Sequence, residues 1–349
     1  LKKRGWEVVA LDVGNQVRRF GKQPEIKFQR SAEGLRKMGY QAAILGTDDL
    51  RLPTLEVFSG VSDGSEKTIF LSSNVALLER SETPEYRVVQ AGGKKLGITG
   101  VLSESYREKL VGDELVHVPA EEGLTAVTAK LEAEKCDLNV LLAFATLDET
   151  AALAKKFPQY QIVATAGGIG EPPLGMELIP DTQTNQVQVG SKGMYVMVVG
   201  LFDDPDAPFR TQRVPLDSRF ADAREMVHLM EEYQAQLKAL GLEGLGLKPQ
   251  PHPSEQNFVG TEKCGECHTT AYAIWEKTPH AHATDSIVTP PERASIPRHF
   301  DPECLSCHVT GWEPQKMFPF ASGYLGLETT PLMTQNGCEN CHGPGSQHA

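Results

Sequence analysis

Six of the seven cysteines occur in three pairs that share one spacing, and each pair is followed at once by a histidine. The pairs with their histidines are Cys264, Cys267 and His268; Cys304, Cys307 and His308; and Cys338, Cys341 and His342. Two thiols at this spacing can form thioethers with the two vinyl groups of one haem, and the adjacent imidazole then faces the iron. The three motifs therefore predict three covalently attached haem c groups, each with its own histidine as proximal ligand.

Zinc binding and disulfide bonds are the alternatives for these cysteines. A zinc ribbon usually takes two C-x-x-C pairs for each metal, so that three pairs would leave one pair without an ion. A C-x-x-C disulfide is usually a labile redox bond rather than a structural staple. Neither alternative requires a histidine after every second cysteine, and we therefore expect haem. The seventh cysteine, Cys136, stands alone, and we expect it to be a small buried side chain.

Four further histidines lie among or beside these motifs and are candidates for the distal side of the irons. They are His280, His282, His299 and His348. An iron with histidine on both sides gives a low-spin haem suited to electron transfer, whereas an open sixth position suits chemistry on small ligands. Spacing does not assign the four to particular irons, and an ordinary surface histidine remains the alternative for each.

The residues around the motifs extend this pattern. Their sequences are YAIWEKTPHAHA at residues 272–283, DPECLSCHVTGW at 301–312 and GCENCHGPGSQH at 337–348. Together with the motif at 264–268, they resemble the tetrahaem cytochrome family of the hydroxylamine-oxidation pathway, over about residues 258–349. The resemblance implies that His280 and His348 are distal ligands, usually of a haem other than the one attached nearest in sequence. His282 is the alternative to His280, and His299 is the remaining candidate.

That family carries a fourth haem, for which this sequence has no motif. We expect the fourth haem either to lie beyond Ala349 or to have been lost. In the second case, one of the three irons is expected to be five-coordinate.

The first two-thirds of the sequence has a different character, because apolar runs of strand length alternate with helical periodicity. Strands are predicted at residues 7–14, 41–46, 138–144 and 161–164, and helices at 25–38, 121–134 and 149–156. This alternation predicts an α/β core. Residues 86–101 and 184–202 have the pattern of hairpins. A helix is predicted over residues 217–239, followed by a glycine-rich stop and a proline-punctuated tether.

Four segments of this part carry a second resemblance. They are residues 11–15, 38–49, 141–149 and 162–172. They resemble the calcineurin-like metallophosphoesterases, in the branch of the periplasmic 5′-nucleotidases, over about residues 1–202. The resemblance implies a mixed-sheet α/β sandwich with helices, followed by a mainly α or irregular multihaem cytochrome c domain. We expect an α/β domain over residues 1–215, a linker helix and tether over 216–257, and the haem domain over 258–349.

The departures from the phosphoesterase pattern concern its metal ligands. Asn15 stands at the bridging aspartate, Asp48 replaces the histidine of the G-N-H-D/E motif, and Phe144 stands where another histidine would follow a strand. Residues 166–170 lack the usual histidines, and the opening D-x-H strand is absent. We expect Asp48 and Asp49 to be surface or capping carboxylates, with weak retention of one metal as the alternative. Phosphohydrolase activity is therefore not expected from a site that normally holds two metals.

Composition restricts the partners and the compartment. The net charge of −12 argues against nucleic acid, and there is no apolar run of membrane-spanning length. We expect redox proteins as electron donor and acceptor, and an oligomer is compatible with the sequence. Because haem c is attached outside the cytoplasmic membrane in bacteria, a periplasmic location is predicted. The start lacks both an initiator Met and a signal-peptide pattern, so that we expect an interior portion of a longer product.

Three classes of function fit these observations. The first is an electron-transfer cytochrome whose phosphoesterase-like domain is a docking or scaffold module. The second is a redox enzyme that acts on a small nitrogen or sulfur compound at an open iron. The third is a metallophosphoesterase with accessory haems. His117 and His228 fit no ligand spacing, and we expect both to be structural.

Overall fold

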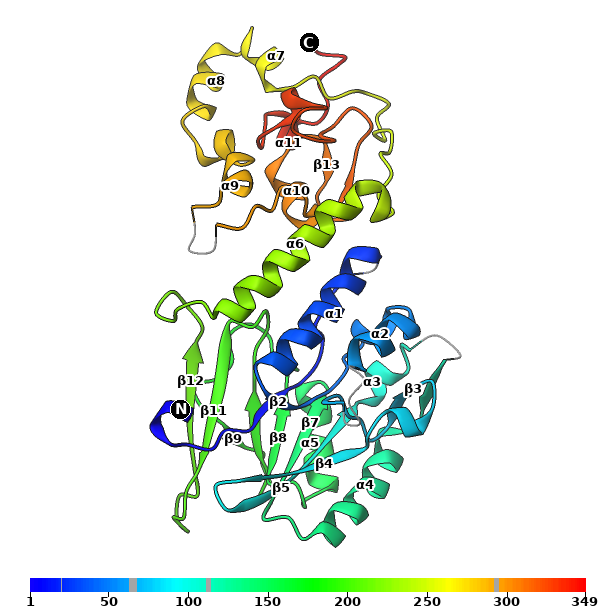
Figure 1. The fold of residues 1–349 in the computed structure, drawn as a ribbon, viewed down its shortest axis with the longest axis vertical. Helices are drawn as coiled ribbons and strands as arrows, with labels where there is room; N and C mark the ends of the chain where they lie inside the picture. Colours follow the sequence, from blue (N-terminus) through cyan, green and yellow to red (C-terminus); the bar gives the residue numbers. More distant parts are fainter. Residues whose placement is uncertain (20, 63–67, 111–113, 292–294) are drawn as a thin grey trace. The chain divides into compact units, whose positions relative to one another are not determined.

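The structure is a computed structural model that describes residues 1–19, 21–62, 68–110, 114–291 and 295–349 (Figure 1). Its contacts divide the chain into two compact units. Unit 1 comprises Leu1–Phe20 and Pro24–Ala221, and unit 2 comprises Gly21–Gln23 and Asp222–Ala349. Each unit has a hydrophobic core of its own.

Unit 1 is built on a mixed sheet of six strands. In spatial order they are β4 (Tyr86–Ala91), β5 (Lys94–Leu102), β7 (Leu138–Phe144), β8 (Ile162–Thr165), β10 (Asn185–Gln188) and β9 (Glu177–Leu178). The four central strands are parallel, and the two edge strands are antiparallel to their neighbours. The turn between β4 and β5 is made by Gly92 and Gly93, which both have positive φ, as a two-residue hairpin turn favours. The predicted hairpin over residues 86–101 is confirmed.

Three two-stranded sheets accompany this sheet in unit 1. They are β1 (Ala10–Asp12) with β2 (Tyr40–Ala43), β3 (Val75–Leu77) with β6 (Leu115–His117), and β11 (Tyr195–Leu201) with β12 (Phe209–Pro215). The predicted hairpin over residues 184–202 is wrong, because β10 pairs with β8 and β9 whereas β11 pairs with β12. Alternating residues allowed either pairing, and the partner was decided by which strand lies alongside in the fold.

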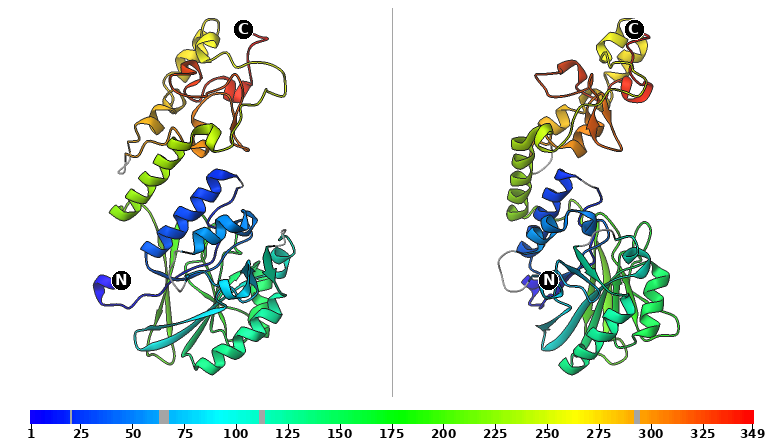
Figure 2. Two further views of the ribbon diagram at one scale, coloured as in Figure 1. Left: turned by 45° about the vertical axis from the view of Figure 1, so that its right-hand side comes forward. Right: turned by 90° about the vertical axis from the view of Figure 1, so that its right-hand side faces the viewer.

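Helices cover both faces of the six-stranded sheet (Figure 2). The helical elements of unit 1 are η1 (Lys2–Arg4), α1 (Lys22–Lys37), η2 (Asp49–Arg51), α2 (Thr54–Val61), η3 (Arg80–Glu82), α3 (Glu104–Arg107), α4 (Ala120–Glu134) and α5 (Leu147–Lys156). In β7, Val140 and Leu142 join the core shared with α1 and α2, whereas Leu141 and Ala143 join the core beneath α4 and α5. A run of apolar residues in a central strand is explained by this burial on both faces. The predicted α/β class is confirmed.

Unit 2 consists of short elements joined by long loops. The elements are α6 (Arg224–Gly244), α7 (Thr261–Gly265), α8 (Thr269–Trp275), η4 (Pro279–His282), α9 (Asp285–Val288), α10 (Pro302–His308), β13 (Trp312–Glu313), β14 (Phe318–Pro319), η5 (Pro331–Met333) and α11 (Glu339–His342). Its core gathers Phe258, Leu305, Trp312 and Phe320. The core therefore surrounds α10, which carries the second haem motif.

Two further sequence expectations need correction. The long helix begins at Arg224 rather than at residue 217, because the Asp217 carboxylate accepts a hydrogen bond from the Arg219 N–H (3.1 Å), which favours a turn over a helix. Cys136 is partly rather than fully buried. None of the described helices combines the length and the apolarity that crossing a membrane requires.

Candidate functional site

The first haem motif (residues 264–268) spans the end of α7 and the start of α8. A helical turn brings Cys264, Cys267 and His268 to one side, since residues three and four apart are neighbours on a helix surface. The turn is closed by the His268 N–H, which donates to the Cys264 carbonyl at 2.9 Å. Cys267 and His268 are exposed. Both thiols and the imidazole are therefore positioned for one planar group bound at the surface of the helix pair.

The second haem motif (residues 304–308) forms most of α10. Asp301 caps this helix by accepting the Glu303 N–H at 2.9 Å. Nδ1 of His308 lies 2.7 Å from the Ala283 carbonyl oxygen and 3.2 Å from the Ser286 hydroxyl. Since a carbonyl can only accept, Nδ1 carries the proton and Nε2 is left with its lone pair. A histidine that ligates a metal typically has this arrangement.

The third haem motif (residues 338–342) begins at the N-cap of α11. Its first cysteine, Cys338, lies close to Cys264 of the first motif. The pKa of the Cys264 thiol is raised, mainly by burial and further by the nearby Cys338 thiol and Glu339 carboxylate. The Cys338 N–H also donates to the Thr261 hydroxyl at 3.2 Å. The first and third motifs are therefore neighbours in the fold.

The imidazole of His348 lies close to that of His268, the histidine of the first motif. Their ring centroids lie 5.9 Å apart, and the ring planes differ by 23°. A metal–nitrogen bond of about 2.0–2.1 Å on each side would place two ring centroids about 6 Å apart. The separation of the two ring centroids thus matches that of two imidazoles on one iron.

The other distal candidates are placed differently. His280 and His282 lie in η4, and both are exposed. The His280 carbonyl accepts the Asn336 N–H at 3.1 Å, so that its segment is held next to the third motif, whereas Nδ1 of His282 lies 3.5 Å from the Asp285 carboxylate. His299 is half-buried, and burial lowers its pKa. Its Nδ1 has no hydrogen-bond partner among the described residues.

A set of polar residues ties the second and third motifs together, and sequence reasoning did not identify it. The Thr310 hydroxyl accepts the Gly337 N–H at 3.1 Å and lies 3.0 Å from both the Gln335 carbonyl oxygen and Oδ1 of Asn340. The Asn340 side-chain amide donates to the Val309 carbonyl at 2.8 Å. These residues adjoin the cysteines in the sequence, but only the hydrogen bonds that they make between the two segments distinguish them from ordinary surface residues.

Asn336 and Thr284 add further links between the three motifs. The Asn336 side chain donates to the Cys307 carbonyl at 2.8 Å, and its own carbonyl accepts the indole N–H of Trp275 at 2.9 Å. The Thr284 hydroxyl donates to the His308 carbonyl at 2.7 Å. Hydrogen bonds within the chain therefore fix the positions of the three motif-bearing segments relative to one another.

The remnant of the phosphoesterase site lies in unit 1, at the ends of β1 and β2. The Asn15 side-chain amide donates to Asp48 at 3.2 Å, and Oδ1 of Asn15 accepts the Asp48 N–H at 3.0 Å. Asp49 is fully buried rather than at the surface, and it accepts the N–H groups of Asn15, Val17 and Gly46. Burial raises the pKa of Asp49 to about 7 against these hydrogen bonds. Asp49 thus holds the backbone at residues 15, 17 and 46, and the expectation of a surface or capping carboxylate is wrong for this residue.

The remaining positions of that site carry no metal ligands. Phe144 packs edge-on against Tyr106, with ring centroids 4.8 Å apart. Among the described residues, no group of three or more His, Cys, Asp or Glu side chains is arranged to hold a metal ion. His117 lies beside Arg107, and His228 lies beside Glu231 and Glu232 on α6, all of them exposed contacts.

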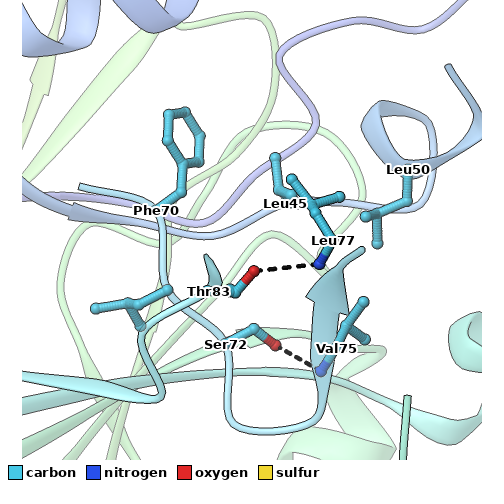
Figure 3. Close-up of a pocket in the computed structure, with 8 residues that line it drawn as sticks. Leu45, Leu50, Phe70, Ser72, Val75, Leu77 and Thr83 are labelled. Carbon is cyan, nitrogen blue, oxygen red and sulfur yellow. Dashed lines mark hydrogen bonds between the residues drawn. The ribbon is translucent and has the colours of Figure 1, made fainter. Parts of the chain in front are cut away.

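An apolar cavity lies near this remnant but is too small for a ligand (Figure 3). It is lined mainly by leucines with Phe70 and Val75, and its volume of about 10 Å³ corresponds to no more than one water molecule. The hydroxyls of Ser72 and Thr83 point toward the adjacent backbone, where they accept the N–H groups of Val75 (3.0 Å) and Leu77 (3.2 Å). This cavity is therefore part of the core of unit 1.

Comparison with known proteins gives a separate result for each part of the chain. Residues 263–343 match the family described as cytochrome c554 and c-prime. Cytochrome c-554 of Nitrosomonas europaea is 34% identical over 97 residues, which cover 25% of this chain and 39% of that protein. The chain thus spans well under half of the length of that relative.

Solved structures resemble the remainder of the chain in fold. A 5′-nucleotidase precursor from Thermus thermophilus superposes with a TM-score of 0.56 at 17% identity, over 68% of this chain and 51% of that one. The sulfate thiohydrolase SoxB of the same organism gives 0.55 at 17% identity, over 69% of this chain and 45% of that one. The chain therefore joins a domain with the fold of the 5′-nucleotidases to a C-terminal segment that is similar to cytochrome c-554.

Proposed function

We propose that the chain is a periplasmic c-type cytochrome that passes single electrons between redox proteins through three covalently attached haems. The observation that carries this proposal is the proximity of the His268 and His348 imidazoles at the first haem motif, with ring centroids 5.9 Å apart. Two imidazoles on one iron leave no open coordination position and favour electron transfer over chemistry on a small ligand.

Each residue of the motifs has a distinct role in this proposal. The six paired cysteines anchor the haems as thioethers, and His268, His308 and His342 are the proximal ligands. His348 is the distal ligand of the haem held by the first motif, and His280 is the distal ligand of a second haem, with His282 and His299 as alternatives. The haem iron supplies the reversible one-electron chemistry. The Ala283 carbonyl orients His308, because it fixes the proton on Nδ1 and directs Nε2 away.

A redox enzyme acting on a small nitrogen or sulfur compound is the second candidate. It is supported by the fact that, among the described residues, no imidazole other than the His268–His348 pair is in ring contact with a second imidazole. The open iron would then belong to the second or the third motif.

The nucleotidase-like domain is a docking or scaffold module in this proposal. The side chains of Asn15 and Asp48 are hydrogen-bonded to each other, and the Asp49 carboxylate accepts hydrogen bonds from three backbone N–H groups. Hydrolysis of phosphate esters by two metals would need these positions free and the missing histidines present. The net charge of −12 further supports a redox partner that presents a basic face.

Absorption spectroscopy of the oxidised and reduced protein, combined with haem quantitation as the pyridine haemochrome, tests the proposal. We expect three haems for each chain, with the haem at the first motif low-spin and unresponsive to carbon monoxide. A high-spin fraction that shifts on addition of carbon monoxide or nitrite would favour the second candidate. Protein matured in a host with the haem-attachment machinery, yet without bound haem, would contradict both.

A further inference from the structure

Glu339 is a buried carboxylate inside the third haem motif, between Cys338 and Asn340. Its side chain is only 3% exposed. It accepts three backbone N–H groups, from Val259 at 3.0 Å, from Gly260 at 2.8 Å and from Gly345 at 2.8 Å. No ion pair of Glu339 is found among the residues that the structure describes. Its burial is therefore compensated by backbone donors alone, as a buried charge requires.

The three donors come from two segments that flank the opposed imidazoles. Val259 and Gly260 directly precede α7, which carries the first haem motif, and Gly345 lies in the loop between His342 and His348. The side chain of Glu339, in the third motif, thus links the residues just before α7 to the loop that ends in His348. The hydrogen bonds leave the loop little freedom to move away from His268.

Two further hydrogen bonds connect the segment before α7 to the loop that ends in His348. The Asn257 N–H donates to the Ser346 hydroxyl at 2.9 Å, and the Ser346 N–H donates to the Asn257 carbonyl at 3.2 Å. Because Ser346 follows Gly345, Glu339 and Asn257 hold the loop at two adjacent residues. The hydrogen bonds of Glu339 differ from these, because three backbone N–H groups donate to one buried carboxylate.

We propose that Glu339 is a positioning residue that holds His348 opposite His268 and so keeps the sixth coordination position of the first haem closed. This inference rests on the proposed assignment of His348 as the distal ligand. An ionised carboxylate only accepts hydrogen bonds, and it matches a pocket that presents only N–H donors. A glutamine of the same shape would point its own N–H₂ group at one or more of these donors. The loop would then be released, and the imidazole of His348 with it.

The test compares Glu339→Gln with Glu266→Gln in the full haem-loaded chain. Glu266 is a matched control, because it also lies between the two cysteines of a haem motif but is exposed and paired with Lys263. In Glu339→Gln we expect the high-spin, carbon monoxide-binding fraction of one haem to rise roughly tenfold or more, the factor that loss of one charge-assisted hydrogen bond corresponds to. In Glu266→Gln the spectrum should stay that of the parent protein.

A third variant, His348→Ala, separates this inference from the ligand assignment on which it rests. If His348→Ala opens one haem to carbon monoxide while Glu339→Gln stays low-spin, the assignment stands and the role of Glu339 is overturned. If His348→Ala itself stays low-spin, the assignment fails, and the inference fails with it. A loss of thermal stability in Glu339→Gln without any change of spin state would show a purely structural role.

A milder pair of variants covers the case in which Glu339→Gln does not mature. Glu339→Asp keeps the charge but shortens the side chain by one methylene, and Ser346→Ala removes only the neighbouring hydroxyl. Both should raise the high-spin fraction, Ser346→Ala less than Glu339→Asp, and addition of imidazole should restore the low-spin spectrum. An unchanged low-spin spectrum in both variants would overturn the proposal.

Discussion

The imidazole rings of His268 and His348 lie close together, with a centroid distance of 5.9 Å and nearly parallel planes, although the two residues lie at opposite ends of the haem-binding sequence. His268 completes the first haem motif, whereas His348 follows the third. The neighbouring hydrogen bonds of Glu339, Thr261 and Ser346 hold the two segments together. Under the proposed ligation, one haem would link the two ends of the haem-binding sequence.

The two histidines of η4 should differ in their effect on the haem spectrum. We expect His280→Ala to convert one low-spin haem to a high-spin form, because Asn336 holds the backbone of His280 beside the third motif. His282→Ala, the matched control, should leave the spectrum unchanged, since its imidazole lies beside Asp285. Magnetic circular dichroism or electron paramagnetic resonance of both variants provides the measurement. The reverse result would make His282 the ligand.

Thr310 should contribute strongly to the stability of the haem module. Thr310→Val removes a hydroxyl that contacts Gly337, Gln335 and Asn340, and it leaves the Gln335 carbonyl without this donor and the Gly337 N–H with Oδ1 of Asn340 as its remaining acceptor. We expect a loss of about 2–3 kcal/mol in the free energy of unfolding. Thr334→Val is the control, because that hydroxyl is exposed and donates to the Pro331 carbonyl within its own turn. Thermal unfolding followed by far-UV circular dichroism measures both variants, and equal melting temperatures would contradict the prediction.

Glu149 should make the stability of unit 1 depend on acidic pH. Hydrogen bonds from Thr146, Ser103 and Ser105 outweigh its partial burial and lower the pKa of Glu149 to about 2. Because the folded-state pKa lies below the unfolded one, the stabilisation is complete above the ordinary glutamate pKa of about 4.3 and is lost as the pH falls toward 2.

The variant Glu149→Gln tests this dependence. We expect it to be less stable than the parent protein by about 1–2 kcal/mol at pH 7, with the difference shrinking between about pH 4.5 and pH 2. Urea unfolding at several pH values gives the comparison. Asp148→Asn is the control, since Asp148 is an exposed carboxylate in the same first helical turn. A difference that is constant with pH would argue against a lowered pKa of Glu149.

The nucleotidase-like domain should neither bind two metals nor hydrolyse phosphate esters. We expect metal analysis after incubation with Mn²⁺ or Zn²⁺ to give no stoichiometric binding beyond the haem iron, and a chromogenic phosphate ester to remain intact. Restoring the bridging carboxylate with Asn15→Asp should not change this, because Phe144 still occupies a ligand position and Asp49 remains bonded to the backbone. Hydrolysis above the rate of the metal-free buffer would contradict the expectation.

The cysteines and their following histidines were identifiable from the sequence because haem attachment is local chemistry. A motif of five residues fixes two thioethers and one ligand whatever the rest of the chain does. The strand at residues 138–144 was also predicted with the bounds of β7, since burial on both faces leaves a continuous apolar run. Pairing was less accessible, and residues 184–202 were wrongly predicted as a hairpin because the neighbours of β10 are β8 and β9.

The sequence by itself determined the three motifs that predict haem attachment, the α/β domain that precedes them, and which residue types stand where the resemblance places metal ligands. The tertiary structure alone decided that His348 faces His268 and that Glu339, rather than Glu266, is a buried acceptor, although both lie between paired cysteines. The physical reason is that a glutamate has the same chemistry at every position. Only the approach of distant backbone N–H groups makes its burial favourable, and that approach is a property of the folded chain.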